Sequence, residues 1–318
     1  MTNHKSLSRR DLMKKSMAGA ALLAARSAVG IACAQTIPLL LRLGGPTHGK
    51  FDGPDAWVQM IRGLGYRAAY CPVRPEEKDD VVNAYAKAAQ KADIVIAEVG
   101  AWSNPISPDE ETRRKALAKC RQRLALADRI GARCCVNISG SRHPERWDGP
   151  HPDNLTGETF DMIVQTTRAI IDDVKPARTY LTLETMPWAY PDSADSYLRL
   201  IKAIDRSRFA VHFDPVNLVT SPQRYYGNRE LIREFFQKLG PRIKSCHAKD
   251  ILLQPKFTTH LDEVRPGLGG LDYAEFLSQL SRFPDTPLMV EHLKDAGEYR
   301  LAADHIRSVA KKIGLSFG

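Results

Sequence analysis

Residues 180–214 decide the fold of this chain, and they read YLTLETMPWAYPDSADSYLRLIKAIDRSRFAVHFD. The stretch begins with a short apolar run rich in strand-forming residues, Tyr180–Glu184, and closes with a second one, Phe209–Asp214. Between these runs, Ala194–Asp205 repeats apolar residues at the spacing of one helix face. A strand, a helix and another strand over this length predict a βαβ unit, in which the two strands run parallel.

The same alternation runs through most of the sequence. Six further apolar runs predict strands at Ile37–Leu43, Tyr66–Tyr70, Ile94–Val99, Arg133–Ser139, Ile243–His247 and Leu288–His292. Helical patterns lie between them, including Asp109–Ile130, Thr159–Val174, Arg229–Leu239, Asp272–Phe283 and Gly297–Ile313. Eight strands alternating with helices predict an α/β fold, the (β/α)8 or TIM barrel, which typically takes about 250 residues. A doubly wound open sheet is the alternative, but Leu43-Gly44-Gly45-Pro46 is a poor glycine-rich phosphate turn.

Residues 1–34 have the layout of an export signal. A basic region precedes a stretch of small and apolar residues, Met17–Val29, and an A-x-A cleavage site, Ala32-Cys33-Ala34. The segment Ser8-Arg9-Arg10-Asp11-Leu12-Met13-Lys14 resembles a twin-arginine signal. We therefore expect a periplasmic or secreted protein, exported by the twin-arginine route, with one catalytic domain at residues 35–318. A membrane-anchored terminus is the alternative; after removal of the signal we expect no membrane association.

The net charge of the chain is concentrated in that segment. The 318 residues carry 46 Lys or Arg and 37 Asp or Glu, a net charge of +9. Residues 1–34 hold six of the basic residues and one of the acidic ones, so residues 35–318 keep 40 and 36, a net charge of +4. Nucleic-acid-binding domains carry concentrated basic patches, and this remainder has no Lys/Arg run. We expect a small-molecule partner and no nucleic acid; association into a homo-oligomer is left open.

The last four predicted strands each end on a side chain that can bind a metal. Three of these side chains are carboxylates and one is an imidazole: Glu184, Asp214, His247 and Glu291. The C-terminal strand ends of a barrel form one ring, so these residues are expected to converge. Any one acidic strand end alone is more often a helix cap or half of a surface ion pair, but three crowded carboxylates repel one another unless a cation lies among them. This donor set suits a divalent metal, with Mn²⁺ as our first expectation and Mg²⁺, Co²⁺, Zn²⁺ or Fe²⁺ as alternatives.

Several motifs around these strand ends resemble those of the xylose isomerase-like TIM barrels. They are Glu184-Thr-Met-Pro187, His212-Phe-Asp214-Pro-Val-Asn217, His247-Ala-Lys249-Asp250, Pro266-Gly-Leu-Gly-Gly-Leu-Asp272 and Glu291. That superfamily comprises sugar isomerases, ketose 3-epimerases, inosose dehydratases and apurinic-site endonucleases. The resemblance covers essentially all of residues 35–318. It implies that Glu184, Asp214, His247 and Glu291 are the metal ligands.

The resemblance also implies an isomerase or epimerase acting on a keto sugar or sugar derivative. A divalent cation bound by a carbonyl and its neighbouring hydroxyl acidifies the carbon between them and stabilises the enediolate formed on deprotonation. Glu184 and Glu291 are the expected catalytic pair, one removing a proton and the other returning it to the opposite face. A metal-dependent lyase or dehydratase acting on a 3-keto-glycoside or cyclitol begins with the same step and is the alternative. An apurinic-site endonuclease and a non-catalytic sugar-binding barrel are the remaining alternatives.

Seven residues at strand ends or in the following loops are candidates for substrate contact: His212, Lys249, Asn217, Glu98, Asn137, Arg142 and Trp188. Lys249 can stabilise developing negative charge, although an ion pair at the barrel rim explains it equally well. Asn217 stands where the epimerase pattern usually has a histidine, and a turn-forming role is its alternative. His212 shares a strand face with Asp214, one layer deeper, where a core histidine is the alternative. Trp102 and Trp147 lie in neighbouring loops that can offer aromatic faces to a sugar.

Overall fold

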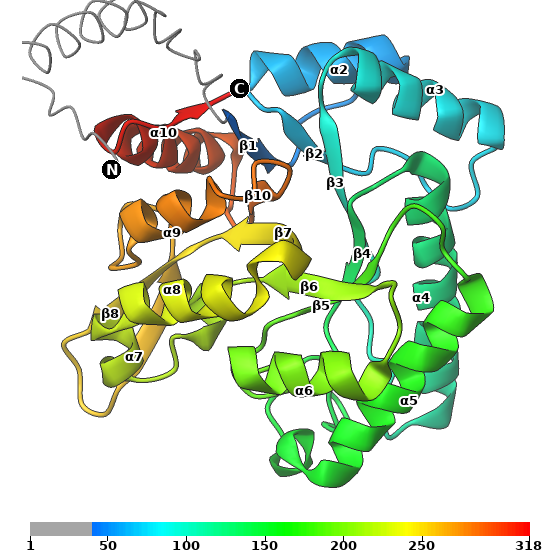
Figure 1. The fold of residues 1–318 in the computed structure, drawn as a ribbon, viewed down its shortest axis with the longest axis vertical. Helices are drawn as coiled ribbons and strands as arrows, with labels where there is room; N and C mark the ends of the chain where they lie inside the picture. The colour runs from blue at the N-terminus through cyan, green and yellow to red at the C-terminus, as the bar shows by residue number, and fades with distance from the viewer. Residues whose placement is uncertain (1–39) are drawn as a thin grey trace, which may run out of the picture. The chain divides into compact units, whose positions relative to one another are not determined.

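The barrel closes through hydrogen bonds between its first and last strands (Figure 1). The computed structural model describes residues 40–318. Eight parallel strands follow one another in the order β1-β2-β3-β4-β5-β6-β7-β10, and β10 pairs back onto β1. These strands are β1 (Leu40–Gly45), β2 (Ala68–Tyr70), β3 (Val95–Gly100), β4 (Cys134–Asn137), β5 (Leu181–Glu184), β6 (Phe209–Phe213), β7 (Ile243–Ala248) and β10 (Pro287–Val290). The predicted (β/α)8 barrel is confirmed.

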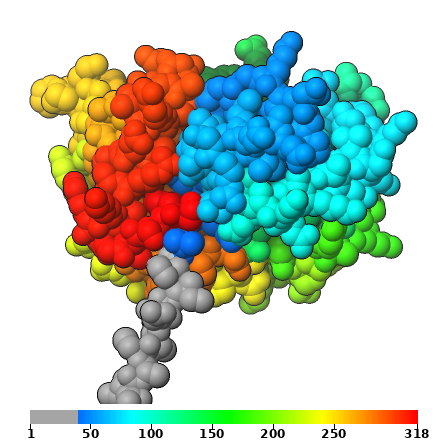
Figure 2. Space-filling view, turned by 90° about the horizontal axis from the view of Figure 1, so that it is seen from above, coloured from blue at the N-terminus to red at the C-terminus, as the bar shows by residue number. Residues whose placement is uncertain are grey.

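Helices surround this sheet on its outer side (Figure 1). They are α2 (Gly53–Gly63), α3 (Asp79–Lys91), α4 (Glu110–Ile130), α5 (Gly157–Val174), α6 (Ala194–Ile204), α7 (Pro222–Tyr226), α8 (Asn228–Leu239), α9 (Tyr273–Leu280) and α10 (Ala296–Lys312). A short last strand, β11 (Ser316–Phe317), pairs with β1. Figure 2 shows the C-terminal elements, in red, packed beside the α2 region, in blue, as the closure of the barrel requires.

Local sequence explains where the helices begin and end. The side chain of Asp109 accepts a hydrogen bond from the Thr112 amide and caps α4. Gly131 ends α4 at φ +77°, a left-handed conformation that glycine adopts without steric cost. The apolar faces of the helices pack against the sheet, and Trp57, Leu124 and Phe235 are almost completely buried. Each such side chain contributes about 1.5–3 kcal/mol of transfer free energy.

One insertion was not predicted: an antiparallel hairpin of β8 (Asp250–Gln254) and β9 (His260–Val264) follows β7. The carboxylate of Asp250 holds the loop after this hairpin, because it accepts hydrogen bonds from the amides of Gly267, Gly269 and Leu271 at 2.9–3.1 Å. Gly269 lies so close to Ile251 that a Cβ there would clash with its backbone. The glycine-rich segment 266–272 therefore folds around the buried carboxylate of Asp250.

The last barrel strand is shorter than the sequence predicts. Leu288–His292 was expected to be extended, whereas β10 ends at Val290. His292 has φ +57°, a left-handed conformation that cannot continue a strand. Glu291 therefore lies just beyond the strand end.

Two expectations concern residues that the structure does not describe. The export signal at residues 1–34, with its cleavage point, and the first residues of the predicted strand Ile37–Leu43 lie outside residues 40–318. Within residues 40–318, none of the helices has both the length and the apolarity that crossing a bilayer requires.

Candidate active site

Four side chains that can bind a metal, called the metal-ligating residues below, meet at the C-terminal end of the barrel. Glu184 is the last residue of β5, Asp214 follows β6, His247 lies near the end of β7 and Glu291 follows β10. The register pairs Met289 with His247, so these strand ends lie at matching heights. One ligand atom from each of the four residues lies within 4.8 Å of all the others. The structure thus brings together the four metal ligands that the sequence predicts.

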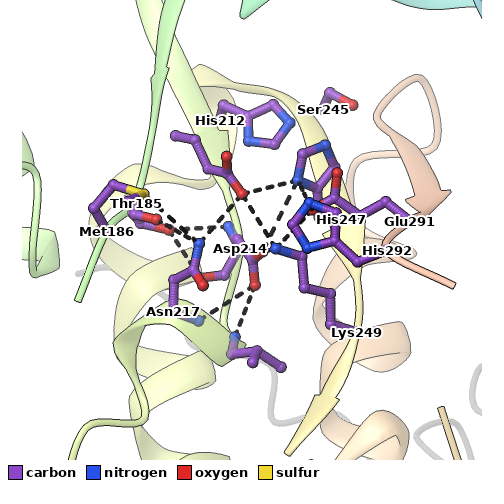
Figure 3. Close-up of polar contacts among 12 residues, drawn as sticks. Thr185, Met186, His212, Asp214, Asn217, Ser245, His247, Lys249, Glu291 and His292 are labelled. Atoms are coloured by element: carbon purple, nitrogen blue, oxygen red, sulfur yellow. Dashed lines mark hydrogen bonds and ion pairs between the residues drawn. The ribbon is translucent and has the colours of Figure 1, made fainter. Parts of the chain in front are cut away.

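The imidazole of His247 is the centre of this cluster. Its Nδ1 atom lies 2.9 Å from Glu184 Oε1, 2.8 Å from Glu291 Oε1 and 3.9 Å from Asp214 Oδ2. Figure 3 shows His247, Asp214 and Glu291 pointing toward one another. Three carboxylate oxygens and one imidazole nitrogen at such separations form a donor set that a divalent cation can share.

The ammonium group of Lys249 lies against the same carboxylates. Its Nζ atom is 2.8 Å from Asp214 Oδ2, 2.7 Å from Glu291 Oε1 and 3.7 Å from Glu184 Oε1. Although Nζ is this close, Asp214 Oδ2 and Glu291 Oε1 are buried and make no hydrogen bond of regular geometry within residues 40–318. A cation can satisfy two such oxygens, so the residues present fit a divalent metal.

The charges of the cluster are unevenly balanced. Burial by itself raises the pKa of Glu184, but the charges of His247 and Lys249 outweigh it and lower this pKa to about 2. Burial also dominates at Asp214 and raises its pKa to about 7, helped by repulsion from Glu184 and opposed by Lys249. The charges of His247 and Lys249 therefore keep Glu184 ionised but leave Asp214 only partly ionised near neutral pH, and an additional positive charge would stabilise its ionised form.

A second polar layer lies beneath the metal-ligating residues. Glu98, at 1% exposure, reaches in from β3 and lies 3.0 Å from His212 Nε2 and 3.3 Å from His247 Nε2. It also accepts a hydrogen bond from the hydroxyl of Ser245. Burial raises the pKa of Glu98, but His247 and His212 lower it to about 2, so the carboxylate is ionised. Glu98 therefore holds Nε2 of His247 and leaves Nδ1 to face Glu184 and Glu291.

A cavity of about 400 Å³ opens above the metal-ligating residues. Its walls include Glu184, Glu291 and Lys249, together with three indole rings from the loops after β3, β4 and β5: Trp102, Trp147 and Trp188. A larger cavity of about 700 Å³, between α2 and α10, contains none of the four metal-ligating residues. The smaller cavity is the candidate active site, because it is the one that reaches the chemically reactive groups.

The seven predicted substrate contacts fall into two groups. Lys249, Asn217 and Trp188 line the cavity. The amide of Asn217 lies 3.3 Å from Glu184 Oε1 and donates to the Thr185 carbonyl at 3.0 Å, so it also positions Glu184. The remaining four residues do not line the cavity: Glu98, Asn137, His212 and Arg142.

Other partners hold those four residues. Glu98 and His212 bond to each other below the ligands. Asn137 is buried and bonded to the backbone of Ser103. The guanidinium of Arg142 donates to the Ile106 carbonyl at 2.6 Å.

Sequence reasoning missed several residues that line the cavity, among them Glu263, His292 and Tyr299. Glu263 belongs to the unpredicted hairpin, and its carboxylate lies 3.1 Å from Nδ1 of His292. Tyr299 comes from α10, on the outer layer, where an aromatic residue is usually part of the core. The position of His292 directly after Glu291 was the one available signal.

The fold and the site define a (β/α)8 barrel with four side chains that could hold a divalent metal at the C-terminal ends of its last four strands. The chain belongs to the xylose isomerase-like TIM barrel family, whose profile matches residues 56–309. No curated protein sequence matches the chain.

Solved structures share the fold at low sequence identity. The probable 3-DHS dehydratase AsbF from Bacillus anthracis is 17% identical, with a TM-score of 0.63 over 85% of this chain and 99% of that one. A D-psicose 3-epimerase solved in the presence of D-fructose is 14% identical, with a TM-score of 0.62 over 86% and 99%. A xylose isomerase-like TIM barrel protein from Mycobacterium smegmatis, in complex with magnesium, is 15% identical, with a TM-score of 0.59 over 86% and 96%. The neighbours of this barrel thus include an epimerase, a dehydratase and a metal-bound protein.

Proposed function

We propose that this protein is a divalent-metal-dependent isomerase or epimerase that removes a proton next to the carbonyl of a keto sugar or sugar derivative. The observation that carries the proposal is the meeting of Glu184 and Glu291 at one point, Nδ1 of His247, from strands that have β6 and β7 between them. Two carboxylates that reach a substrate from different walls of a cavity can act on different faces of one carbon. The family and its epimerase neighbour support this reading.

A divalent cation held by Glu184, Asp214, His247 and Glu291 would polarise the substrate carbonyl and acidify the adjacent carbon. We take Mn²⁺ as the first candidate. Glu291 is ionised: burial raises its pKa, but His247 and Lys249 lower it below the usual range of a carboxyl group. It can therefore accept a proton, while Glu184, once protonated, can supply one to the other face.

Three further side chains position the metal-ligating residues or stabilise negative charge on the substrate. The ammonium of Lys249, at 2.7 Å from Glu291 Oε1, can donate a hydrogen bond to an oxygen that gains negative charge. Asn217 restrains Glu184 through its 3.3 Å contact. Glu98 keeps His247 in one orientation from below.

The proposed activity can be tested with keto sugars and 3-keto-glycosides, incubated with the Mn²⁺-loaded full chain and followed by NMR. We expect an epimeric or isomeric sugar to appear and the reaction to stop with a chelator. Release of an aglycone or of water from the substrate instead would identify the alternative lyase or dehydratase. Turnover of none of these substrates, with the metal bound, would contradict both.

We also propose that the protein acts outside the cytoplasm after removal of residues 1–34. The basic region, apolar stretch and A-x-A site of this segment support the proposal. N-terminal sequencing of the protein from the periplasm of its host is expected to begin at Gln35. A chain that stays intact in the cytoplasm would contradict this proposal.

A further inference from the structure

The cavity above the metal-ligating residues has an apolar middle layer. Ile138, Met186 and Ala189 form a small buried cluster, and Trp102 packs against it. The indole of Trp102 folds back over the end of β3, where Gly100 makes room: a Cβ on Gly100 would lie within van der Waals overlap of the ring. The ring centre of Trp102 is 6.3 Å from that of His247, so this layer directly adjoins the metal-ligating residues.

The mouth of the cavity is formed by two further indoles. Trp147 is 42% exposed and Trp188 is 38% exposed, although both line the cavity. The Nε1 atom of Trp188 donates to the Asp148 carbonyl at 2.7 Å, which ties the loop after β5 to the loop after β4. Each ring therefore has a solvent-facing surface on which a ligand can lie.

Buried hydrogen bonds cross-link the loop that carries Trp147 on both sides of that residue. Asn154, completely buried, donates to the Gly149 carbonyl at 3.0 Å and accepts from the Arg142 amide at 2.8 Å. The buried hydroxyl of Ser141 donates to the same Gly149 carbonyl at 2.6 Å. A rim fixed in this way binds a ligand without the entropic cost of ordering a mobile loop.

The charges of the cavity are mainly negative. Glu184, Glu263, Glu291 and Asp148 line it, and within residues 40–318 its lining contains no arginine and, as its one lysine, Lys249. The ammonium of Lys249 already contacts Asp214 and Glu291. His292, the other basic side chain of the lining, lies 3.1 Å from Glu263. Because both groups already face carboxylates, the walls favour an uncharged substrate over one that carries a phosphate or carboxylate.

We propose that the substrate is an uncharged glycoside of two rings. The reacting sugar ring lies against the metal-ligating residues, and a second ring with an apolar face stacks on Trp147 and Trp188 at the mouth. This inference rests on the proposed function for the position of the reacting ring. The second ring is inferred from the layered order of the cavity. Polar ligands lie at its base, apolar side chains in the middle and half-exposed indoles at the rim.

The test compares the affinities of three unreactive glycosides for the Mn²⁺-loaded full chain by calorimetry. Methyl β-D-glucoside has one ring, phenyl β-D-glucoside adds an aromatic ring, and cellobiose adds a sugar ring. We expect one of the two-ring ligands to bind about five- to tenfold more tightly than the one-ring ligand, as one stacked ring predicts. Tighter binding of phenyl β-D-glucoside would identify the second ring as an aglycone, and tighter binding of cellobiose would identify it as a sugar. Equal affinity for all three ligands would overturn the proposal.

Variants locate the second ring. Trp147→Leu removes no hydrogen bond of the structure, and the double variant with Trp188→Leu removes both indoles. We expect each to reduce the advantage of the two-ring ligand and the double variant to abolish it, with less than twofold change for methyl β-D-glucoside. Tyr226→Leu, at a tyrosine that is 78% exposed and outside the cavity lining, is the matched control and should change nothing. An unchanged advantage in both indole variants would contradict the proposal.

A separate measurement tests whether the substrate is uncharged. Phenyl β-D-glucoside 6-phosphate should bind at least about tenfold more weakly than the neutral glycoside, and equal or tighter binding would overturn that part. None of these ligands needs to react. Failure of the proposed function, seen as the absence of turnover, is therefore distinguishable from failure of the two-ring inference.

Discussion

The carboxylate of Glu98 lies 3.3 Å from Nε2 of His247, although the two residues are 149 positions apart in the chain. The contact crosses the barrel from β3 to β7 and is completely buried. The two nitrogens of the imidazole therefore have different roles. Nε2 faces Glu98, whereas Nδ1 faces the carboxylates of Glu184 and Glu291.

Replacing Glu98 should therefore weaken metal binding although none of the four metal-ligating residues is replaced. We expect Glu98→Gln to raise the Kd for Mn²⁺ about 10- to 100-fold, the usual effect of losing a carboxylate behind a ligating histidine. Titration calorimetry measures this Kd, with Glu111→Gln on the exposed face of α4 as the control. Unchanged affinity in Glu98→Gln would show that His247 is positioned without it.

Metal binding should stabilise the folded barrel. The buried carboxylates repel one another, and a cation that binds the folded state at about 100 times its Kd adds about 2.7 kcal/mol. We expect saturating Mn²⁺ to raise the Tm of the chain by about 5 °C or more. Asp214→Asn should lose most of this rise in differential scanning fluorimetry, and an equal rise in that variant would exclude Asp214 as a ligand.

The affinity for metal should increase with pH. Burial lowers the pKa of His247, but Glu291, Glu98 and Glu184 outweigh it and raise the pKa well above 6.5. Metal must therefore displace a proton from Nδ1, and a second one from Asp214 where that carboxyl, with its pKa of about 7, is still protonated. We expect the Kd for Mn²⁺ to fall at least about tenfold per pH unit between pH 6 and 8. A Kd independent of pH over this range would contradict the ligand assignment.

Closure of the barrel should depend on Gly44 in β1. A Cβ at this position would lie 2.5 Å from the Ala68 carbonyl oxygen and 2.6 Å from the sulfur of Met289, so two neighbouring strands would have to move. We expect Gly44→Ala to reduce the free energy of unfolding by about 1–3 kcal/mol or more, measured by urea denaturation. Gly63→Ala is the matched control because, among the described residues outside its own helical turn, no atom lies within 4 Å of the added Cβ. Equal stability of the two variants would show that β1 has room that the structure does not show.

The barrel, and the convergence of four side chains at one end of it, could be predicted because both follow from the repeating order of strands and helices. Strands alternate with helices along the chain, and parallel strands place their C-terminal ends on one face. Glu184, Asp214, His247 and Glu291 each interrupt or end an apolar run, so local sequence already singles them out.

The other parts of the site depend on contacts that no local pattern reveals. Glu98 was predicted to meet the substrate because it lies near the end of a strand, but its side chain points beneath His247. Glu263 was missed because its strand, β9, has no buried residue and therefore no apolar pattern that marks a core strand. His292 was placed in a strand, whereas its left-handed backbone ends that strand.

In the proposed reaction, Glu291 and Glu184 move a proton on the carbon next to a carbonyl. The most direct measurement is the rate at which the Mn²⁺-loaded full chain incorporates solvent deuterium into its keto-sugar substrate, followed by NMR in D₂O. We expect one deuteron at the reacting carbon of the product, and an exchange rate about 10²- to 10⁴-fold lower in Glu291→Gln at saturating metal. Product that forms without deuterium, or an unchanged rate in Glu291→Gln, would contradict the proposed reaction.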